Sequence, residues 1–237
     1  MKRKTNKAEV ARVAAFEPNS SAAEAFRTLR TNLQFTMSGD SSCVIAVTSS
    51  FPGEGKSWNS ANIANVFAAQ GKKTLLIDAD LRKGVQEKKF NVSNSNGLSN
   101  YLANVNFSEK NFIKETPFEN LYIITRGNVP PNPSELLDSE RMDILISKMK
   151  EEFEVVIIDA PPVLVVTDAL ILAGKVDKVV LVAAMNETNK NFVLESKNAL
   201  DKVNAKLAGV ILNKAKIDKK SYYKYGYGKY YSESSKK

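Results

Sequence analysis

A glycine-containing segment after the first apolar run has the residue types that bind phosphate. It runs from Ser50 to Ser57 as SFPGEGKS, the spacing of a Walker A loop with serine at the usual first glycine or alanine. Gly53 and Gly55 allow backbone amides to turn toward phosphate oxygens, and the start of the next helix adds favourable partial charge. We expect Lys56 to reach the β- and γ-phosphates of a nucleotide and the Ser57 hydroxyl to ligate Mg²⁺.

Three aspartates follow two apolar runs further along the chain. Asp78 ends the run 74–78, Asp80 lies two residues beyond it, and Asp159 ends the run 155–159. An apolar strand that ends in aspartate beside a phosphate loop is the Walker B arrangement, although such an aspartate can also cap a helix. If the strand over 74–78 continues past Asp78, the side chains of Asp78 and Asp80 point the same way. They can then serve one metal ion and one reacting hydroxyl, as phosphoryl transfer requires.

Apolar runs and amphipathic segments alternate between residues 44 and 213. The runs are nearly continuous in apolar character, which is typical of strands that helices cover on both faces. We predict strands at Val44–Thr48, Thr74–Asp78, Leu121–Thr125, Val155–Asp159, Val179–Ala183 and Gly209–Asn213. Helices are expected at about 57–70, 97–104, 134–152, 167–175 and 189–205. The repeated strand–helix order predicts an α/β P-loop NTPase with a doubly wound, mostly parallel sheet, in which ligands bind at the carboxyl ends of the strands.

One more helix is expected ahead of the first strand. Residues Ser21 to Glu24 have capping-box spacing, and apolar residues follow at helical intervals until Ser38-Gly39-Asp40. We therefore divide the chain into three parts. They are a basic, irregular segment over 1–19, a P-loop domain over 20–213 whose first helix spans 20–37, and a flexible basic tail over 214–237.

Composition excludes several kinds of chemistry. The 237 residues include no histidine, which removes histidine acid–base catalysis, His-ligated zinc and Ser-His-Asp triads. The single cysteine excludes a disulfide framework and fits a reducing compartment. No apolar stretch approaches the ~20 residues of a membrane span, and no signal peptide is visible. We therefore expect a cytoplasmic protein.

The net charge of +8 lies in the two ends of the chain. Residues 1–12 carry five basic side chains against one glutamate, and residues 214–237 carry eight lysines against two carboxylates. Basic ends of this kind are solubilising tails, or they contact anionic lipid, acidic partners or nucleic acid.

These motifs resemble those of bacterial tyrosine kinases (BY-kinases), the cytoplasmic kinases of capsule and exopolysaccharide synthesis in Gram-positive bacteria. The likeness covers about residues 18–231 and includes the phosphate loop, the segment 76–82 and the strand 155–159. It extends to a proline-rich segment over 127–137 and to the strand 209–213, which resembles the family's strand whose terminal asparagine lies against adenine.

The resemblance implies a protein-tyrosine kinase that uses ATP and Mg²⁺. Asp78 would be the carboxylate nearest the tyrosine hydroxyl and the metal, and Asp80 and Asp159 would complete the metal shell, in part through water. The expected catalytic residues are Lys56, Asp78, Asp80 and Asp159. The expected metal ligands are Ser57, Asp78, Asp80 and Asp159. The expected nucleotide contacts are Pro52, Gly53, Glu54, Gly55, Lys56, Ser57, Trp58 and Asn213.

Assembly and modification are implied in the same way. Glu24, Arg27 and Arg30 fit the family's E-x-x-R-x-x-R helix, which lies at subunit contacts of a ring, although Glu24 can instead cap its own helix. Six of the eight tyrosines lie in one ten-residue stretch of the tail and resemble the family's autophosphorylated cluster. They are Tyr222, Tyr223, Tyr225, Tyr227, Tyr230 and Tyr231. A tail so poor in aliphatic residues cannot bury them, and an unmodified aromatic tail is the alternative. The resemblance favours phosphorylation in trans.

Two positions depart from the family pattern. Trp58 stands where a small hydroxyl residue usually contacts the α-phosphate, so a side-chain contact is lost while the Trp58 amide can still donate. Gly84 stands where proline often follows Arg82, and we expect little effect from that change.

The family implies partners besides a second copy of the chain. They are the cytoplasmic segment of a transmembrane activator, which recruits the kinase to the inner face of the membrane, and a protein-tyrosine phosphatase. Two rival functions remain. A partitioning-type P-loop ATPase shares the fold but carries a signature lysine early in its loop, where this chain has Phe51. A nucleotide-gated scaffold without kinase activity is the other rival, and nucleic-acid binding is the least favoured role for the tail.

Overall fold

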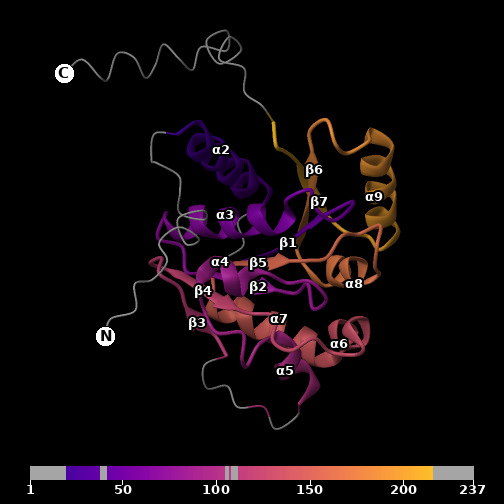
Figure 1. Cartoon of the computed structure of the whole chain (residues 1–237). Coiled ribbons are helices and arrows are strands. Elements are labelled where there is room, and N and C mark those ends of the chain that lie inside the picture. The colour runs from indigo at the N-terminus through magenta and orange to yellow at the C-terminus, as the bar shows by residue number, and fades with distance from the viewer. Residues whose placement is uncertain (1–19, 38–41, 105–106, 108–111, 216–237) are drawn as a thin grey trace, which may run out of the picture.

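The computed structural model describes residues 20–37, 42–104, 107 and 112–215 (Figure 1). Its strands form one sheet in the order β3-β4-β2-β5-β1-β6-β7. The strands are β1 (Cys43–Ser49), β2 (Thr74–Asp78), β3 (Lys114–Glu115), β4 (Leu121–Ile124), β5 (Val155–Asp159), β6 (Lys178–Ala184) and β7 (Leu207–Asn213). Neighbouring strands are parallel except β3 and β4, which are antiparallel. The predicted mostly parallel α/β sheet is confirmed.

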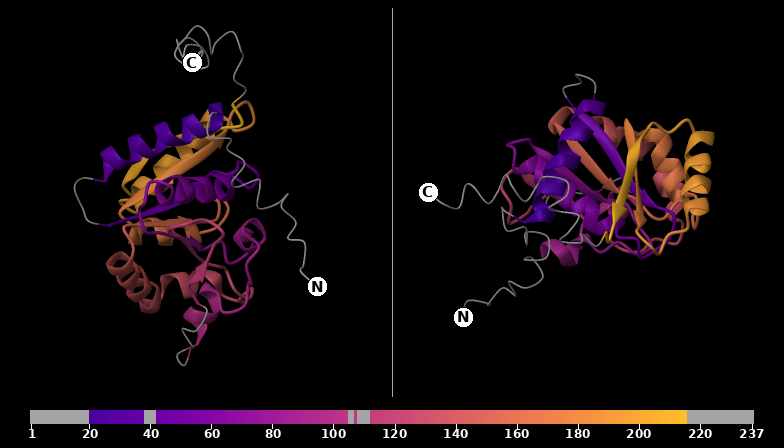
Figure 2. Two further views of the ribbon diagram at one scale, coloured as in Figure 1. Left: turned by 90° about the vertical axis from the view of Figure 1, so that its left-hand side faces the viewer. Right: turned by 90° about the horizontal axis from the view of Figure 1, so that it is seen from above.

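Helices cover both faces of this sheet. On one face α2 (Ser21–Thr36) packs on α3 (Lys56–Ala68), and the short α4 (Gln86–Phe90) adds Phe90 to the same core (Figure 2). The opposite core contains residues of the remaining helices. They are α5 (Leu98–Ala103), α6 (Pro133–Asp138), α7 (Glu140–Glu152), α8 (Asp168–Lys175) and α9 (Lys190–Lys202).

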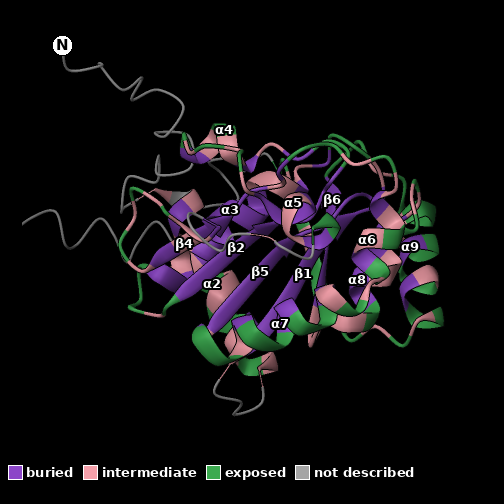
Figure 3. Ribbon diagram, turned by 90° about the horizontal axis from the view of Figure 1, so that it is seen from below, coloured by how far each residue is buried: buried purple, intermediate pink, exposed green. Residues whose placement is uncertain are grey.

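The central strand β1 shows why these strands read as continuous apolar runs. Val44 and Ala46 enter the core that contains α7 and α8, whereas Ile45 and Val47 enter the core beneath α2 and α3. Every residue of β1 is buried, as are those of β2 and β5 (Figure 3). Alternation between polar and apolar residues is therefore absent from these central strands.

Several local expectations need correction. The cap of α2 is Ser20, whose hydroxyl accepts a hydrogen bond from the Ala23 amide at 3.1 Å, so the cap lies one residue before the predicted Ser21. The helix predicted over 134–152 is two helices, because Ser139 has an extended backbone (φ −66°, ψ 151°) and separates α6 from α7. The short elements α4 and β3 were not predicted at all.

Strand register brings the predicted carboxylates to one edge of the sheet. Asp78 of β2 is the register partner of Asp159 on β5, and Asp159 is in turn the partner of Val47 on β1. The phosphate loop begins directly after β1, so the parallel sheet places it beside both strand ends.

Aromatic, apolar and polar contacts attach the helix α2 to α3 and to the turn that follows it. The ring centroids of Phe26 and Trp58 lie 5.3 Å apart in an edge-on arrangement. The Arg30 guanidinium donates to the Val66 carbonyl at 3.2 Å, and Gln34 donates to Gln70 at 2.8 Å. Trp58, the unusual residue next to Ser57, therefore connects the helix of the phosphate loop to α2.

Removing the Phe26 ring should weaken the attachment of α2 to α3. Phe26 is 6% exposed, whereas Phe35 on the same helix is 84% exposed, so the two give a matched pair. We expect Phe26→Ala to lower the free energy of unfolding by about 3 kcal/mol and Phe35→Ala to change it by less than about 0.5 kcal/mol. Urea unfolding measures both.

The chain's single tryptophan, Trp58, supplies a local readout of the same change. Its emission should shift to the red in Phe26→Ala, because the indole loses its packing partner and gains water contact. Equal stability and unchanged emission in the two variants would contradict the proposed attachment.

Candidate active site

Two glycines with positive φ shape the phosphate loop. Gly53 has φ 88° and Gly55, the N-cap of α3, has φ 98°, a conformation that side chains other than glycine rarely adopt. A Cβ at Gly55 would also lie 2.0 Å from Nδ2 of Asn213. Asn213 ends β7 and donates from this amide to the Glu54 carbonyl at 2.8 Å. The structure therefore brings the predicted Asn213 against the loop itself.

The buried Glu54 carboxylate ties the loop to the end of β6. One oxygen accepts from the Phe51 amide at 3.0 Å, and the other accepts from the Thr188 hydroxyl. Thr188 also accepts from the Ala184 amide at 2.9 Å. Thr188 was not predicted from the sequence, because a lone threonine in a loop carries no signal of such a contact.

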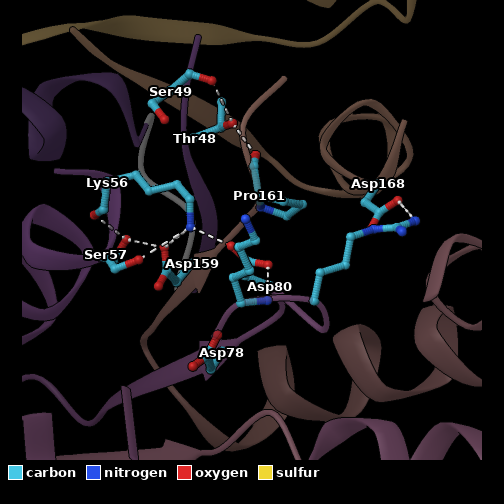
Figure 4. Close-up of polar contacts among 12 residues, drawn as sticks. Thr48, Ser49, Lys56, Ser57, Asp78, Asp80, Asp159, Pro161 and Asp168 are labelled. Carbon is cyan, nitrogen blue, oxygen red and sulfur yellow. Dashed lines mark hydrogen bonds and ion pairs between the residues drawn. The ribbon is translucent and has the colours of Figure 1, made fainter. Parts of the chain in front are cut away.

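The Lys56 ammonium group lies among the aspartates. It is 2.8 Å from Asp80 and 3.6 Å from Asp159, and it donates to the Ser57 hydroxyl at 3.2 Å (Figure 4). Lys56 is 8% exposed. Burial by itself lowers the pKa of Lys56, but the negative charges of Asp159 and Asp80 outweigh it and the pKa ends above its ordinary value. Lys56 is therefore held in its charged form.

Asp78 lies apart from this ion pair (Figure 4). One of its oxygens accepts from the Gln86 amide at 2.9 Å, and the other, Oδ1, is buried without a hydrogen-bond partner in the described structure. Burial raises the pKa of Asp78 well above its ordinary value, and the nearby charge of Asp159 raises it further. Both effects favour the protonated form of Asp78.

The expectation that Asp78 and Asp80 point the same way was conditional on a longer strand. β2 ends at Asp78, and a turn follows in which the Leu81 amide donates to the Ala79 carbonyl. Asp80 reaches Lys56 from this turn, and its second oxygen accepts from the Lys83 amide at 2.8 Å. The three carboxylates still converge, but by a turn rather than by strand alternation.

Gly84 lies directly against the Asp78 carboxylate. A Cβ at this position would lie 2.6 Å from both oxygens of Asp78. A side chain at residue 84 would therefore require the Asp78 carboxylate or the turn to shift from its present position. That glycine in place of the family's proline has little effect stays a prediction.

Gln86 is a site residue that the sequence did not reveal. Its fully buried side chain donates to the Ser57 carbonyl at 2.8 Å and to Asp159 at 2.7 Å. Arg82 belongs to the predicted motif over 76–82. It forms a two-point ion pair with the buried Asp168 of α8, with N–O distances of 2.9 and 3.1 Å. That pair holds the turn carrying Asp80 against the neighbouring helix.

The remaining predicted residues divide into those near the loop and those outside the description. Pro52, Ser57 and Trp58 lie on the loop or in the first turn of α3, as expected. The six tail tyrosines lie outside the described residues. Among the residues described, no group of three or more carboxylate, cysteine or histidine side chains is arranged to hold a metal ion.

The loop between β1 and α3 contains two glycines with positive φ and leads into a buried lysine, and aspartates lie at the ends of adjacent strands. This combination defines a P-loop nucleotide-binding protein. Comparisons with known proteins make the class more specific. A family model described as an AAA domain matches residues 42–207. The putative tyrosine-protein kinase CapB of Staphylococcus aureus is 40% identical over 213 residues, which cover 90% of this chain and 92% of that relative.

Solved structures agree with that relationship. The kinase domain of the Escherichia coli tyrosine kinase ETK is 36% identical and superposes with a TM-score of 0.85, covering 92% of this chain and 84% of that one. The chimerical protein CapA2B2 is 37% identical with a TM-score of 0.82, covering 89% and 91% respectively. The chain belongs to the bacterial tyrosine kinases, and it is a protein-tyrosine kinase. In the described ranges, no helix is both long and apolar enough to cross a membrane.

The raised pKa of Asp78 predicts that the folded protein is less stable at neutral than at acidic pH. Because the native protein holds this proton more tightly than the unfolded chain, its free energy of unfolding falls as pH rises from the ordinary aspartate pKa, about 3.9, toward the raised value. Asp78→Asn removes that cost. We expect the nucleotide-free variant to be more stable than wild type at pH 7 and the difference to shrink toward pH 4.

Urea unfolding between pH 4 and pH 8, with a chelator present, measures this difference. If the difference in free energy of unfolding between Asp78→Asn and wild type is the same at pH 4 and pH 8, the pKa of Asp78 is not raised.

Proposed function

We propose that this kinase transfers the γ-phosphoryl group of Mg²⁺-bound ATP to the tyrosines of its own tail, in trans within a ring, and thereby regulates capsule or exopolysaccharide synthesis. The observation that carries the proposal is the convergence of Lys56 and three aspartates beside the phosphate loop. The same loop also supports nucleotide binding.

The residues present fit a divalent cation. Mg²⁺ prefers hard oxygen ligands and keeps several waters, and the site offers the Ser57 hydroxyl with the carboxylates of Asp78, Asp80 and Asp159. Asp78 supports this fit most directly, because its buried Oδ1 has no partner among the described residues. When bound, the cation would offset the negative charge of the phosphates.

The proposed roles follow from the contacts. Lys56 holds the carboxylates in the structure described, and with nucleotide present its ammonium would bind the transferring phosphoryl group. Asp78 would accept the proton of the tyrosine hydroxyl, for which its raised pKa suits it. Pro52, Gly53, Glu54, Gly55 and Trp58 would contribute backbone groups around the phosphates, and Asn213 would contact adenine.

The tail begins close to the site. Asn213 contacts the phosphate loop, and the tail tyrosines lie up to 18 residues beyond it. An extended chain of that length spans at most about 60 Å, which reaches a neighbour's site as well as the chain's own. Each phosphate adds about −1.5 to −2 charges, so a basic tail would become acidic and would be repelled from a carboxylate-lined site. Phosphorylation would therefore loosen the ring.

The rival partitioning-type ATPase finds less support. Phe51, at the place of that class's signature lysine, packs edge-on against Phe192 of α9 with centroids 4.9 Å apart. At this position the chain therefore has a packed aromatic ring, whereas the rival class has a lysine that extends toward the partner subunit. A nucleotide-gated scaffold without transfer activity remains an outcome of the assay below.

The proposal includes partners beyond the ring. The family resemblance implies activation by a separate protein, and a chimerical protein, CapA2B2, is among the similar structures. We propose that the cytoplasmic segment of a transmembrane activator recruits this kinase to the inner face of the membrane and that a tyrosine phosphatase reverses the modification.

Lys56→Met should abolish phosphotyrosine formation. Loss of this clamp on the phosphoryl group should lower the rate by at least about 100-fold. Incubation with ATP and Mg²⁺, with and without an activator segment, followed by phosphotyrosine detection measures the change. Lys197→Met is the matched control, because Lys197 pairs with Asp201 on the exposed side of α9 and should leave the rate unchanged. Full activity in a folded Lys56→Met protein would rule out the assignment.

Mixing two variants distinguishes transfer in trans from transfer in cis. One is Lys56→Met with an intact tail, and the other has all six tail tyrosines replaced by phenylalanine. Transfer in trans labels the tail of the inactive chain. An unlabelled mixture that still co-assembles, under conditions where wild type labels itself, indicates transfer in cis.

The ring contact on α2 is best tested at Arg27. Arg27 pairs with Glu24 at 2.7 Å and is partly exposed, whereas Arg30 is bound to the Val66 carbonyl of α3. We expect Arg27→Ala to yield monomers in sedimentation without loss of stability, and Arg30→Ala also to loosen α2. Thr28→Ala, an exposed change on the same helix, is the control. A ring that survives Arg27→Ala would place the subunit contact elsewhere.

A further inference from the structure

Gln86 contacts three parts of the active site at once. Its side-chain Nε2 donates to the Ser57 carbonyl at 2.8 Å and to Asp159 Oδ2 at 2.7 Å. Its backbone amide donates to Asp78 Oδ2 at 2.9 Å. One residue at the start of α4 thereby connects the helix of the phosphate loop with the ends of β5 and β2.

The contacts fix which way the Gln86 carboxamide faces. Nε2 meets a carbonyl and a carboxylate, which are both acceptors, so the reverse orientation would set an oxygen against two oxygens. Oε1 therefore takes the other position, where it is buried and has no hydrogen-bond partner in the described structure. Asp78 Oδ1 is buried and unpaired in the same way.

Two unpaired acceptors this close to the site point to a missing donor. An unsatisfied buried acceptor destabilises the folded state, and the other side-chain polar atoms of both residues already have hydrogen-bond partners. The nearby carboxylates carry excess negative charge, which favours water held by a cation over a further anion.

We propose that Gln86 is a positioning residue for the divalent cation: its Nε2 fixes Asp159 and the Ser57 backbone, and its Oε1, with Asp78 Oδ1, accepts hydrogen bonds from cation-bound water. This inference rests on the proposed function, and it adds a residue outside the Walker motifs. Glutamine is required because it donates from one side and accepts on the other. Glutamate would set a charge against Asp159, and leucine would supply neither donor nor acceptor.

The test compares nucleotide binding with and without the cation. The affinity of a fluorescent ADP is measured in saturating Mg²⁺ and again in a chelator, for wild type, Gln86→Leu and Gln86→Glu. We expect the affinity in Mg²⁺ to fall by about tenfold or more in both variants, while that in the chelator changes by less than about twofold. Gln70→Leu is the matched control, since Gln70 is an exposed glutamine in the turn after α3 and should change neither value.

Other outcomes overturn the proposal. Equal losses with and without Mg²⁺ would make Gln86 a support of the loop alone, and no loss would remove any role in cation binding. If Gln86→Leu does not fold, Gln86→Glu decides the result, because it keeps the size and polarity of the side chain. The readout needs no tyrosine transfer, so it stands even if wild type forms no phosphotyrosine and the proposed function fails.

Discussion

The ammonium group of Lys56 balances negative charge that the fold concentrates at the ends of two strands. Asp78 and Asp159 are fully buried register partners, and Asp80 is 4% exposed. Buried like charges are stable near one another only when a counter-charge or proton is present. Lys56 supplies that counter-charge at 2.8 and 3.6 Å from two of them. A nucleotide that binds Lys56 removes this compensation, so in the proposed function a divalent cation takes it over.

The rest of the fold keeps this arrangement in place. The parallel sheet fixes the relative height of the strand ends, and Gly84 leaves the space in which the Asp78 carboxylate lies. Arg82 and Asp168 hold the turn with Asp80, and Glu54 with Thr188 holds the loop. Each of these contacts joins the carboxyl edge of the sheet to a neighbouring loop or helix, so the edge is rigid where the charges meet.

The sequence alone was enough to locate the buried strands and the residues of the phosphate-binding motifs. The strands were predictable because both of their faces are buried, and the loop and aspartates because their spacing is diagnostic. It failed where tertiary contacts decide. The five-residue α4 has too few residues for a periodic pattern, and Gln86 looks like a surface glutamine in a lysine-rich segment. The predicted strand end at Asp78 is correct, but the path of the turn that brings Asp80 to Lys56 depends on contacts distant in sequence, such as that between Arg82 and Asp168. The significance of Gly84 depends on an oxygen six residues away in the chain.

The contact between Asn213 and Gly55 has a consequence for protein engineering. Nδ2 of Asn213 occupies the space that a side chain at position 55 would need, and it also holds the Glu54 carbonyl. The phosphate loop and the last residue of the edge strand β7 thus form one unit, although 158 positions of sequence separate them. A phosphate loop grafted into another protein would be incomplete without that strand. A circular permutant opened between α9 and β7 would test how far the conformation of the loop depends on its contact with Asn213.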